Sequence, residues 1–228
     1  MSHKPVKISL LTIFKKWLWI SYNHIGWLIL LNFMTAILSL TVVGLGFAFS
    51  LIFFPLSKLL KNDSYSYSEL RQDIAKSWKW SIGYGTLLLV IFLILTTNIY
   101  FYKHIQKSGH LAEWAATAIV VITIIYLMVS LWVIPTKIYF QESLKNSFKK
   151  AWILCFDNIK VSFAMFFVFI GMAFIGVYTG VVYFLLTFGL TASFIWVAFY
   201  EVMQKYGMGD PIPSAGSRTL KDLIKPWA

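Results

Sequence analysis

Long apolar segments separated by short basic ones make up most of this chain. The first, residues 17–57, contains no Lys, Arg, Asp or Glu. As one helix it would be about 60 Å long at about 1.5 Å per residue, whereas the hydrocarbon core of a bilayer is about 30 Å thick. Residues 43–46 near its middle read Val-Gly-Leu-Gly, and two glycines so close together favour a turn. The pattern predicts a membrane hairpin of two helices, roughly 25–40 and 47–59.

Three further segments also lack Lys, Arg, Asp and Glu. Residues 80–102 and 114–136 are each long enough to span a bilayer once and would form a second hairpin. Residues 161–200 are again of double length, and we expect their turn at residues 187–190, which contain a glycine. Six transmembrane helices in three hairpins are therefore predicted.

A short amphipathic segment precedes each hairpin, with apolar residues on one helical face among lysines. The apolar sets are Leu10, Phe14 and Trp17; Leu70, Ile74 and Trp78; and Leu144, Phe148 and Trp152. Ser66 and Glu69 form a capping-box pattern, which predicts the start of the second of these helices. Helices with a basic side and an apolar side lie at the surface of a membrane. We expect three interfacial helices.

The same unit, an interfacial helix followed by a hairpin, therefore occurs three times, at about 8–60, 66–140 and 143–206. The alternative is that these likenesses only reflect the general enrichment of Trp and Lys at membrane interfaces. The repeat predicts an all-α polytopic membrane bundle that forms one domain and contains three parallel hairpins. Residues 207–228 are expected to form a cytoplasmic tail.

Composition and charge agree with a membrane location. Hydrophobic residues make up 59% of the 228 residues, and the mean hydropathy is +0.72. The net charge of +11 would suggest nucleic acid for a soluble protein. Here all but two of the 20 Lys and Arg, Lys103 and Lys107, fall on one side of the predicted membrane. Because positively charged loops stay on the cytoplasmic side of a membrane, we expect both termini in the cytoplasm, contact with anionic lipid, and no nucleic acid. The long first apolar segment predicts no cleavable signal peptide.

Three short segments resemble a known family. They are Phe54-Pro55-Leu56-Ser57-Lys58, Ser66-Tyr67-Ser68-Glu69-Leu70 leading to Trp78, and the stretch from Leu144 to Trp152. With the hydropathy profile they resemble the YesL-like family of bacterial integral membrane proteins of unknown function. More distantly they are similar to six-helix membrane domains such as that of some glycerophosphodiester phosphodiesterases. The resemblance implies a place in the inner membrane of a bacterial cell, an accessory role beside carbohydrate uptake or polysaccharide degradation, and no catalytic residues.

Candidate chemistry is sparse. No Gly-x-Ser-x-Gly, His-Glu-x-x-His or phosphate-loop motif occurs. His104, His110 and Glu113 make the one conceivable metal cluster, but their spacing is irregular, so we expect no metal and no cofactor. Cys155 has no evident acid–base partner, and a buried structural thiol is the favoured interpretation. His24 is expected at the interface.

The predicted spans contain no ionisable Asp, Glu, Lys or Arg, which disfavours ion-coupled transport. Their polar residues are expected to bond to the backbone or to a neighbouring helix: Asn32, Thr96, Thr97, Asn98, Tyr126 and Tyr178. Gly176 and Gly180, with Gly171 nearby, form a small-xxx-small pattern that predicts close packing on another helix.

These observations favour a non-enzymatic accessory membrane protein that binds anionic lipid or a membrane-protein partner; its oligomeric state is not predicted. The candidate lipid-interface residues are Lys15, Lys16, Trp17, Lys76, Trp78, Lys79, Lys149, Lys150 and Trp152. One alternative is a translocator of lipid or small solutes, with a polar cavity lined by Asn98 or the tyrosines. Another is an enzyme acting on lipid head groups through Glu201, Asp157 or His24. The many aromatic residues could also bind a hydrophobic ligand between the helices. The favoured interpretation is that they fill the core or face lipid.

Overall fold

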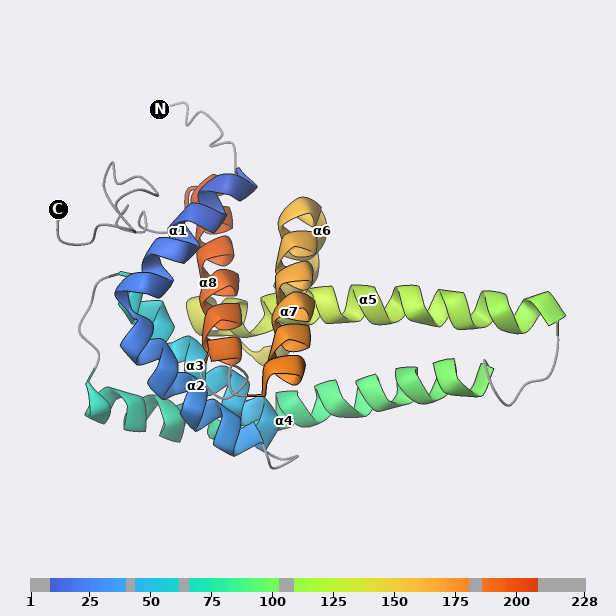
Figure 1. The fold of residues 1–228 in the computed structure, drawn as a ribbon, viewed down its shortest axis with the longest axis horizontal. Helices are drawn as coiled ribbons and strands as arrows, with labels where there is room; N and C mark the ends of the chain where they lie inside the picture. The colour runs from blue at the N-terminus through green and yellow to red at the C-terminus, as the bar shows by residue number, and fades with distance from the viewer. Residues whose placement is uncertain (1–8, 40–43, 62–65, 103–108, 181–185, 209–228) are drawn as a thin grey trace.

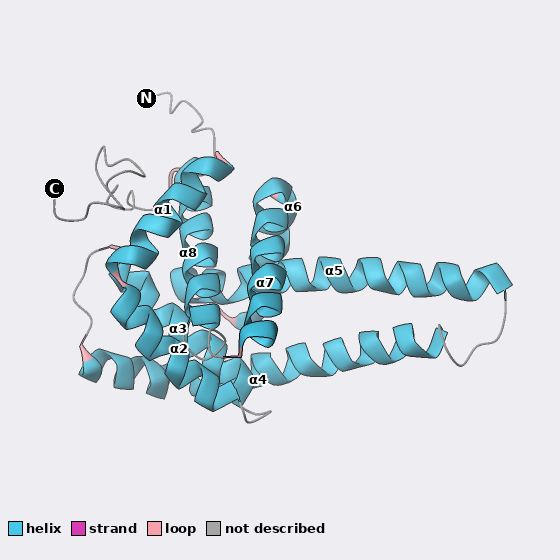
Figure 2. Cartoon of the chain, in the orientation of Figure 1, coloured by secondary structure: helices cyan, strands magenta, loops and turns pink. Residues whose placement is uncertain are grey.

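The computed structural model describes residues 9–39, 44–61, 66–102, 109–180 and 186–208, and the regular structure in these ranges is all helical (Figure 2). In chain order the helices are α1 Leu10–Asn23, α2 Ile25–Ser39, α3 Gly44–Leu59, α4 Tyr67–Tyr100, α5 Gly109–Phe140, α6 Leu144–Asp157, α7 Ile159–Thr179 and α8 Phe188–Lys205. The predicted all-helical class is confirmed for these residues.

Three stretches of helix in the described part are long and apolar enough to cross a membrane: Ser68–Tyr100, Ala112–Phe140 and Ile159–Thr179. The α1–α2 pair, bent by 86°, would make a fourth if it counts as one broken span. The other helices are shorter. For example, α2 has 15 residues and α3 has 16, or about 22–24 Å at about 1.5 Å per residue. The structure is therefore that of a helical membrane protein with three or four candidate spans, which is fewer than the six predicted.

The two longest helices form an arm. Figure 1 shows α4 and α5 lying side by side and extending well beyond the other helices, while α7 and α8 run across their direction. This differs from the predicted compact bundle of parallel spans. The reason is length: α4 has 34 residues and α5 has 32, and the short helices pack against one end of this pair only.

The core of the protein is organised around α8. This helix contacts α1, α2, α3, α5 and α7, and every residue from Thr191 to Met203 is buried. Trp196 is fully buried, and its indole N–H donates to the carbonyl oxygen of Phe53 on α3 at 2.7 Å. The ring of Phe199 lies between aromatic neighbours, with centroids 5.4 Å from Trp196 and 6.1 Å from Trp132 on α5. Aromatic side chains thus join α3, α5 and α8.

The first turn of α8 is capped from another helix. Thr187 makes no side-chain cap hydrogen bond, but the fully buried Asn32 on α2 accepts a hydrogen bond from the Gly189 N–H at 2.9 Å. A Cβ on Gly189 would lie 3.1 Å from the Leu28 carbonyl oxygen. The predicted turn at 187–190 is therefore wrong: α8 has already begun there, and Gly189 lets α2 approach closely.

We expect Asn32→Leu to lower the free energy of unfolding by about 1–3 kcal/mol, because the Gly189 N–H would be buried without that acceptor. Asn98→Leu is the matched control, since Asn98 is exposed and donates only to the Ile94 carbonyl of its own helix at 2.7 Å. Unfolding by SDS titration in mixed micelles measures both variants. Equal stability of the two would contradict the capping role.

The first and third units begin alike. Helices α1 and α6 both have 14 residues, and one residue, His24 or Asn158, separates each from the next helix. Their buried residues occupy the same four helical positions, the fourth, eighth, eleventh and twelfth: Ile13, Trp17, Ile20 and Ser21 in α1, and Ser147, Ala151, Leu154 and Cys155 in α6. The two helices therefore dock through equivalent faces.

The second unit departs from this pattern. The capping box at Ser66 and Glu69 is confirmed, with both reciprocal hydrogen bonds present. However, α4 then continues without a break to Tyr100. The predicted second interfacial helix is therefore the first part of a long helix rather than a separate element.

The predicted glycine packing is wrong at two of three positions. Gly180 ends α7 with φ 54°, a left-handed conformation that suits glycine. An added Cβ at Gly180 or Gly171 would meet nothing within 4 Å, while Gly176 is buried. The predicted turn at 43–46 lies only partly within the described residues, where Gly44 begins α3.

Candidate lipid-contact site

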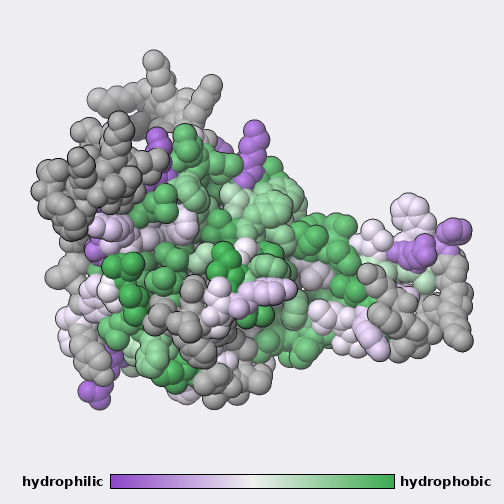
Figure 3. All heavy atoms as spheres, in the orientation of Figure 1, coloured by the Kyte–Doolittle hydropathy of each residue, from purple (hydrophilic) through white to green (hydrophobic). Residues whose placement is uncertain are grey.

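The outward face of α6 combines lysines with large apolar side chains. Lys145 and Lys149 are exposed, and Trp152, Ile153 and Phe156 expose 52%, 65% and 46% of their surface. Figure 3 shows hydrophobic residues over most of the central part of the displayed face, with strongly hydrophilic residues near its ends. In water, such an apolar surface would be unfavourable. Beside lysines on an amphipathic helix, it suits the boundary between lipid tails and head groups.

The outward face of α1 has the same character. Leu10, Leu11 and Phe14 expose 44%, 62% and 44% of their surface, and Lys15 is exposed beside them. The opposite face of α1 packs on α8. Lys15 and Lys149 occupy the same position, the sixth, in α1 and α6, whereas the exposed apolar residues lie near the start of α1 and in the second half of α6.

Trp17 is not on this outward face. It is only 8% exposed, its indole N–H donates to the Leu190 carbonyl at 3.0 Å and to Ser193 Oγ at 2.9 Å, and its ring meets Phe194 edge-on. It is a packing residue between α1 and α8 rather than a membrane anchor. The sequence carried a sign of this, because Trp17 follows its two lysines directly, whereas Trp152 comes one residue later. That shift moves the ring from the buried face to the exposed one.

The six candidate lysines divide into two groups. Lys15, Lys76, Lys79 and Lys149 are exposed. The Lys79 ammonium lies 5.6 Å from the ring centre of Trp78, which is itself 47% exposed. Lys16 and Lys150 instead pair with protein carboxylates, Glu201 and Glu142, each at 2.5 Å. Sequence reasoning missed both pairs.

The acidic candidates for head-group chemistry join helices. Glu201 on α8 binds Lys16 on α1. Asp157 at the end of α6 accepts from Lys205 Nζ at 3.3 Å and from the Tyr206 hydroxyl. His24 is half-buried at the C-terminal cap of α1. Each of these carboxylates already has a cation or hydroxyl partner in the protein.

No group of three or more His, Cys, Asp or Glu in the described ranges could hold a metal ion. His110 Nδ1 lies 4.0 Å from Glu113 Oε2, and both side chains are exposed, while His104 lies outside those ranges. Cys155 is buried, and this burial raises the pKa of its thiol. The raised pKa disfavours the reactive thiolate.

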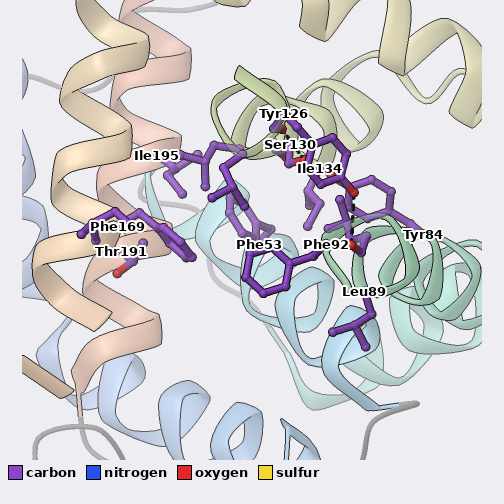
Figure 4. Close-up of a pocket in the computed structure, with 15 residues that line it drawn as sticks. Phe53, Tyr84, Leu89, Phe92, Tyr126, Ser130, Ile134, Phe169, Thr191 and Ile195 are labelled. Atoms are coloured by element: carbon purple, nitrogen blue, oxygen red, sulfur yellow. Dashed lines mark hydrogen bonds between the residues drawn. The ribbon is translucent and has the colours of Figure 1, made fainter. Parts of the chain in front are cut away.

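An apolar cavity of about 380 Å³ lies among α3, α4, α5, α7 and α8 (Figure 4). Two tyrosines in its wall bond to backbone carbonyls rather than to each other. The Tyr84 hydroxyl donates to Ser130 at 3.0 Å, and the Tyr126 hydroxyl donates to Leu88 at 3.3 Å. Asn98 does not line the cavity. The polar cavity expected for a translocator of small solutes is therefore not found at this place.

Several polar residues of the apolar segments bond to the backbone, as predicted. Thr96 Oγ1 donates to the Phe92 carbonyl at 2.9 Å, Asn98 and Tyr126 donate as described above, and Asn32 bonds to α8. These bonds satisfy polar groups that lipid could not. They are a structural use of the residues rather than a transport path.

Together, the fold and these surfaces define an α-helical membrane protein with basic, aromatic-rich outer faces. Comparison with protein-family models, with curated proteins and with solved structures gives no match for this chain. The resemblance to the YesL-like family therefore stays an expectation from the sequence.

Proposed function

We propose that this protein is a non-enzymatic accessory protein of the bacterial cell membrane that binds anionic lipid through its interfacial helices. The observation that supports this most directly is the exposed face of α6, where Lys145 and Lys149 stand beside Trp152, Ile153 and Phe156. The outward face of α1 also presents Lys15 beside exposed apolar residues. In this proposal the chain crosses the membrane six times in three hairpins, and both termini are cytoplasmic.

The expected free energy of lipid binding follows from the charges of the exposed lysines. A lysine near an anionic membrane surface contributes about 1 kcal/mol, and salt screens this attraction within a Debye length. Among the described residues, the four exposed candidates form no ion pair with a carboxylate, whereas Lys16 and Lys150 are paired with Glu201 and Glu142 and hold α1 and α6 to neighbouring segments. A role beside carbohydrate uptake, with a membrane-protein partner, is implied only by the family resemblance.

The lipid preference is tested by replacing Lys15, Lys76, Lys79 and Lys149 together with glutamine. We expect each lost charge to weaken anionic-lipid binding by about 1 kcal/mol at low salt. The measurement is the ratio of phosphatidylglycerol to phosphatidylcholine retained by the purified protein in mild detergent, read by mass spectrometry at low and high salt.

The matched control replaces the same four lysines with arginine, which keeps the charge and should keep the retained ratio. The wild-type ratio should fall as salt is raised, and the glutamine variant should show little further fall. If the glutamine variant retained phosphatidylglycerol as the wild type does, the proposed binding of anionic lipid by these lysines would be refuted.

A further inference from the structure

We infer that the apolar cavity among α3, α4, α5, α7 and α8 holds one acyl chain of an anionic phospholipid, with the lipid phosphate beside Lys137. This inference deepens the proposed function and rests on it for the choice of an anionic membrane lipid. The cavity volume of about 380 Å³ falls within the range of about 300–1,000 Å³ typical of small-molecule sites.

The cavity wall offers an apolar surface even where it carries hydroxyl groups. Beyond the two tyrosine hydroxyls, Ser130 Oγ donates to the Tyr126 carbonyl and Thr191 Oγ1 donates to the Thr187 carbonyl, each at 2.7 Å. All four hydroxyl protons are thus used inside the protein. Water in this cavity would find few partners, and apolar cavities of this kind stay dry. An alkyl chain needs no such partner.

The cavity lies where an alkyl chain of a membrane lipid can reach it. It is lined by Leu88 and Phe92 of α4 and by Phe169 and Ile170 of α7, which belong to helices apolar enough to cross a membrane. Phe92 and Ile170 are also 39% and 43% exposed, so the wall continues onto the outer surface. Lipid hydrocarbon, rather than water, would surround this opening.

A cation lies one helical turn from one end of the cavity. Tyr84 and Ile134 are lining residues; one turn away on the same two helices are Trp80 and Lys137, with Lys137 Nζ 5.6 Å from the Trp80 ring centre. A chain extending past Tyr84 and Ile134 would bring its head group to this lysine.

The charge of Lys137 is not neutralised by the groups that contact it. Its ammonium donates to the backbone carbonyl of Glu142, and the carboxylate of that residue is paired with Lys150. A lysine beside a tryptophan ring at the end of an apolar cavity complements a phosphate that is attached to a hydrocarbon chain.

The test uses the full-length protein in nanodiscs that contain a trace of phosphatidylglycerol with a photoactivatable group in its acyl chain. Mapping of the labelled peptides by mass spectrometry should find label on the cavity-lining stretches of α4, α5 and α7. Leu88→Trp should fill the cavity and lower that labelling at least fivefold. Leu87→Trp is the control, because Leu87 is the neighbouring residue, is 42% exposed and does not line the cavity.

The head-group part is tested with Lys137→Gln. We expect this variant to remove the preference of the cavity label for phosphatidylglycerol over a phosphatidylcholine probe with the same chain, while Lys160→Gln, which changes an exposed lysine on α7, leaves it intact. Leu127→Trp fills the cavity from α5 and replaces Leu88→Trp if that variant does not fold.

Labelling spread evenly over the exposed helices, or unchanged in both cavity-filling variants, would overturn the inference. So would equal labelling by the two probes, or labelling confined to the second apolar pocket around Met128, Cys155 and Phe163.

The four-lysine glutamine variant separates the two proposals. If it keeps the cavity label but retains less phosphatidylglycerol overall, both proposals are supported. If overall retention is unchanged and the cavity still prefers phosphatidylglycerol, only the proposed lipid binding by the exposed lysines fails.

Discussion

Replacing Trp196 with alanine should lower the free energy of unfolding by about 3–5 kcal/mol, the largest effect expected for a single side chain in this protein. Trp196 is fully buried in α8 and packs on Phe53, Phe199 and Tyr200. Alanine would leave a cavity between α3 and α8 and would remove the hydrogen bond to the Phe53 carbonyl. SDS titration or thermal unfolding in detergent measures the change.

Two further variants separate packing from hydrogen bonding at this position. Trp196→Phe keeps a ring but loses the N–H donor, so its cost should include about 1 kcal/mol for that bond. Trp114→Ala is the matched control, because Trp114 is 73% exposed on α5, and surface substitutions usually change stability by less than about 0.5 kcal/mol. Similar losses for Trp196→Ala and Trp114→Ala would refute the central position of α8.

Replacing Lys16 with methionine should lower the free energy of unfolding by about 2 kcal/mol, somewhat less than for a fully buried pair because one side chain remains partly in contact with solvent. The exposed fractions of the side chains are 23% for Lys16 and 10% for Glu201. Without Lys16, the Glu201 carboxylate would be enclosed without its cation. Most of the expected loss comes from that isolated charge rather than from the lost attraction.

A double substitution tests this account. Adding Glu201→Gln to Lys16→Met removes the isolated charge and should restore most of the lost stability. Lys205→Met is the control, since its ion pair with Asp157 is more exposed, at 33% and 51%, and such pairs contribute at most about 1 kcal/mol. If the double variant were less stable than Lys16→Met alone, the pair would not act through desolvation of Glu201.

The sequence alone determined the features that depend on residues close together along the chain. The four segments without charged residues predict apolar helices, since only a helix satisfies its own backbone inside lipid. The structure has helices in all four of these segments. The capping box at Ser66 and Glu69 involves residues three apart, so its pattern could be recognised directly. Trp78 and Trp152 are exposed, as expected for residues at a membrane interface, but Leu70, which was predicted on the same helical face as Trp78, is buried.

Features that join distant residues were decided only by the tertiary structure. Lys16 meets Glu201, Trp17 lies against Ser193, and Asn32 caps α8 at Gly189. The spacing of Trp17 from its two lysines indicates which face of α1 it occupies, but the local patterns of these residues do not identify their partners, Glu201, Ser193 and Gly189, more than 150 residues away. The same holds for the cavity, whose wall is assembled from five helices.

The physical reason is that a lipid tail is about as apolar as a leucine side chain. In a soluble protein the hydrophobic pattern separates the buried face of a helix from the exposed face, but in an apolar segment both faces look alike. The pattern therefore determined that the chain is helical and suited to a membrane. Which faces meet protein, which meet lipid, and how the long α4–α5 arm lies against α7 and α8 were decided by packing, small residues and a few long-range polar contacts.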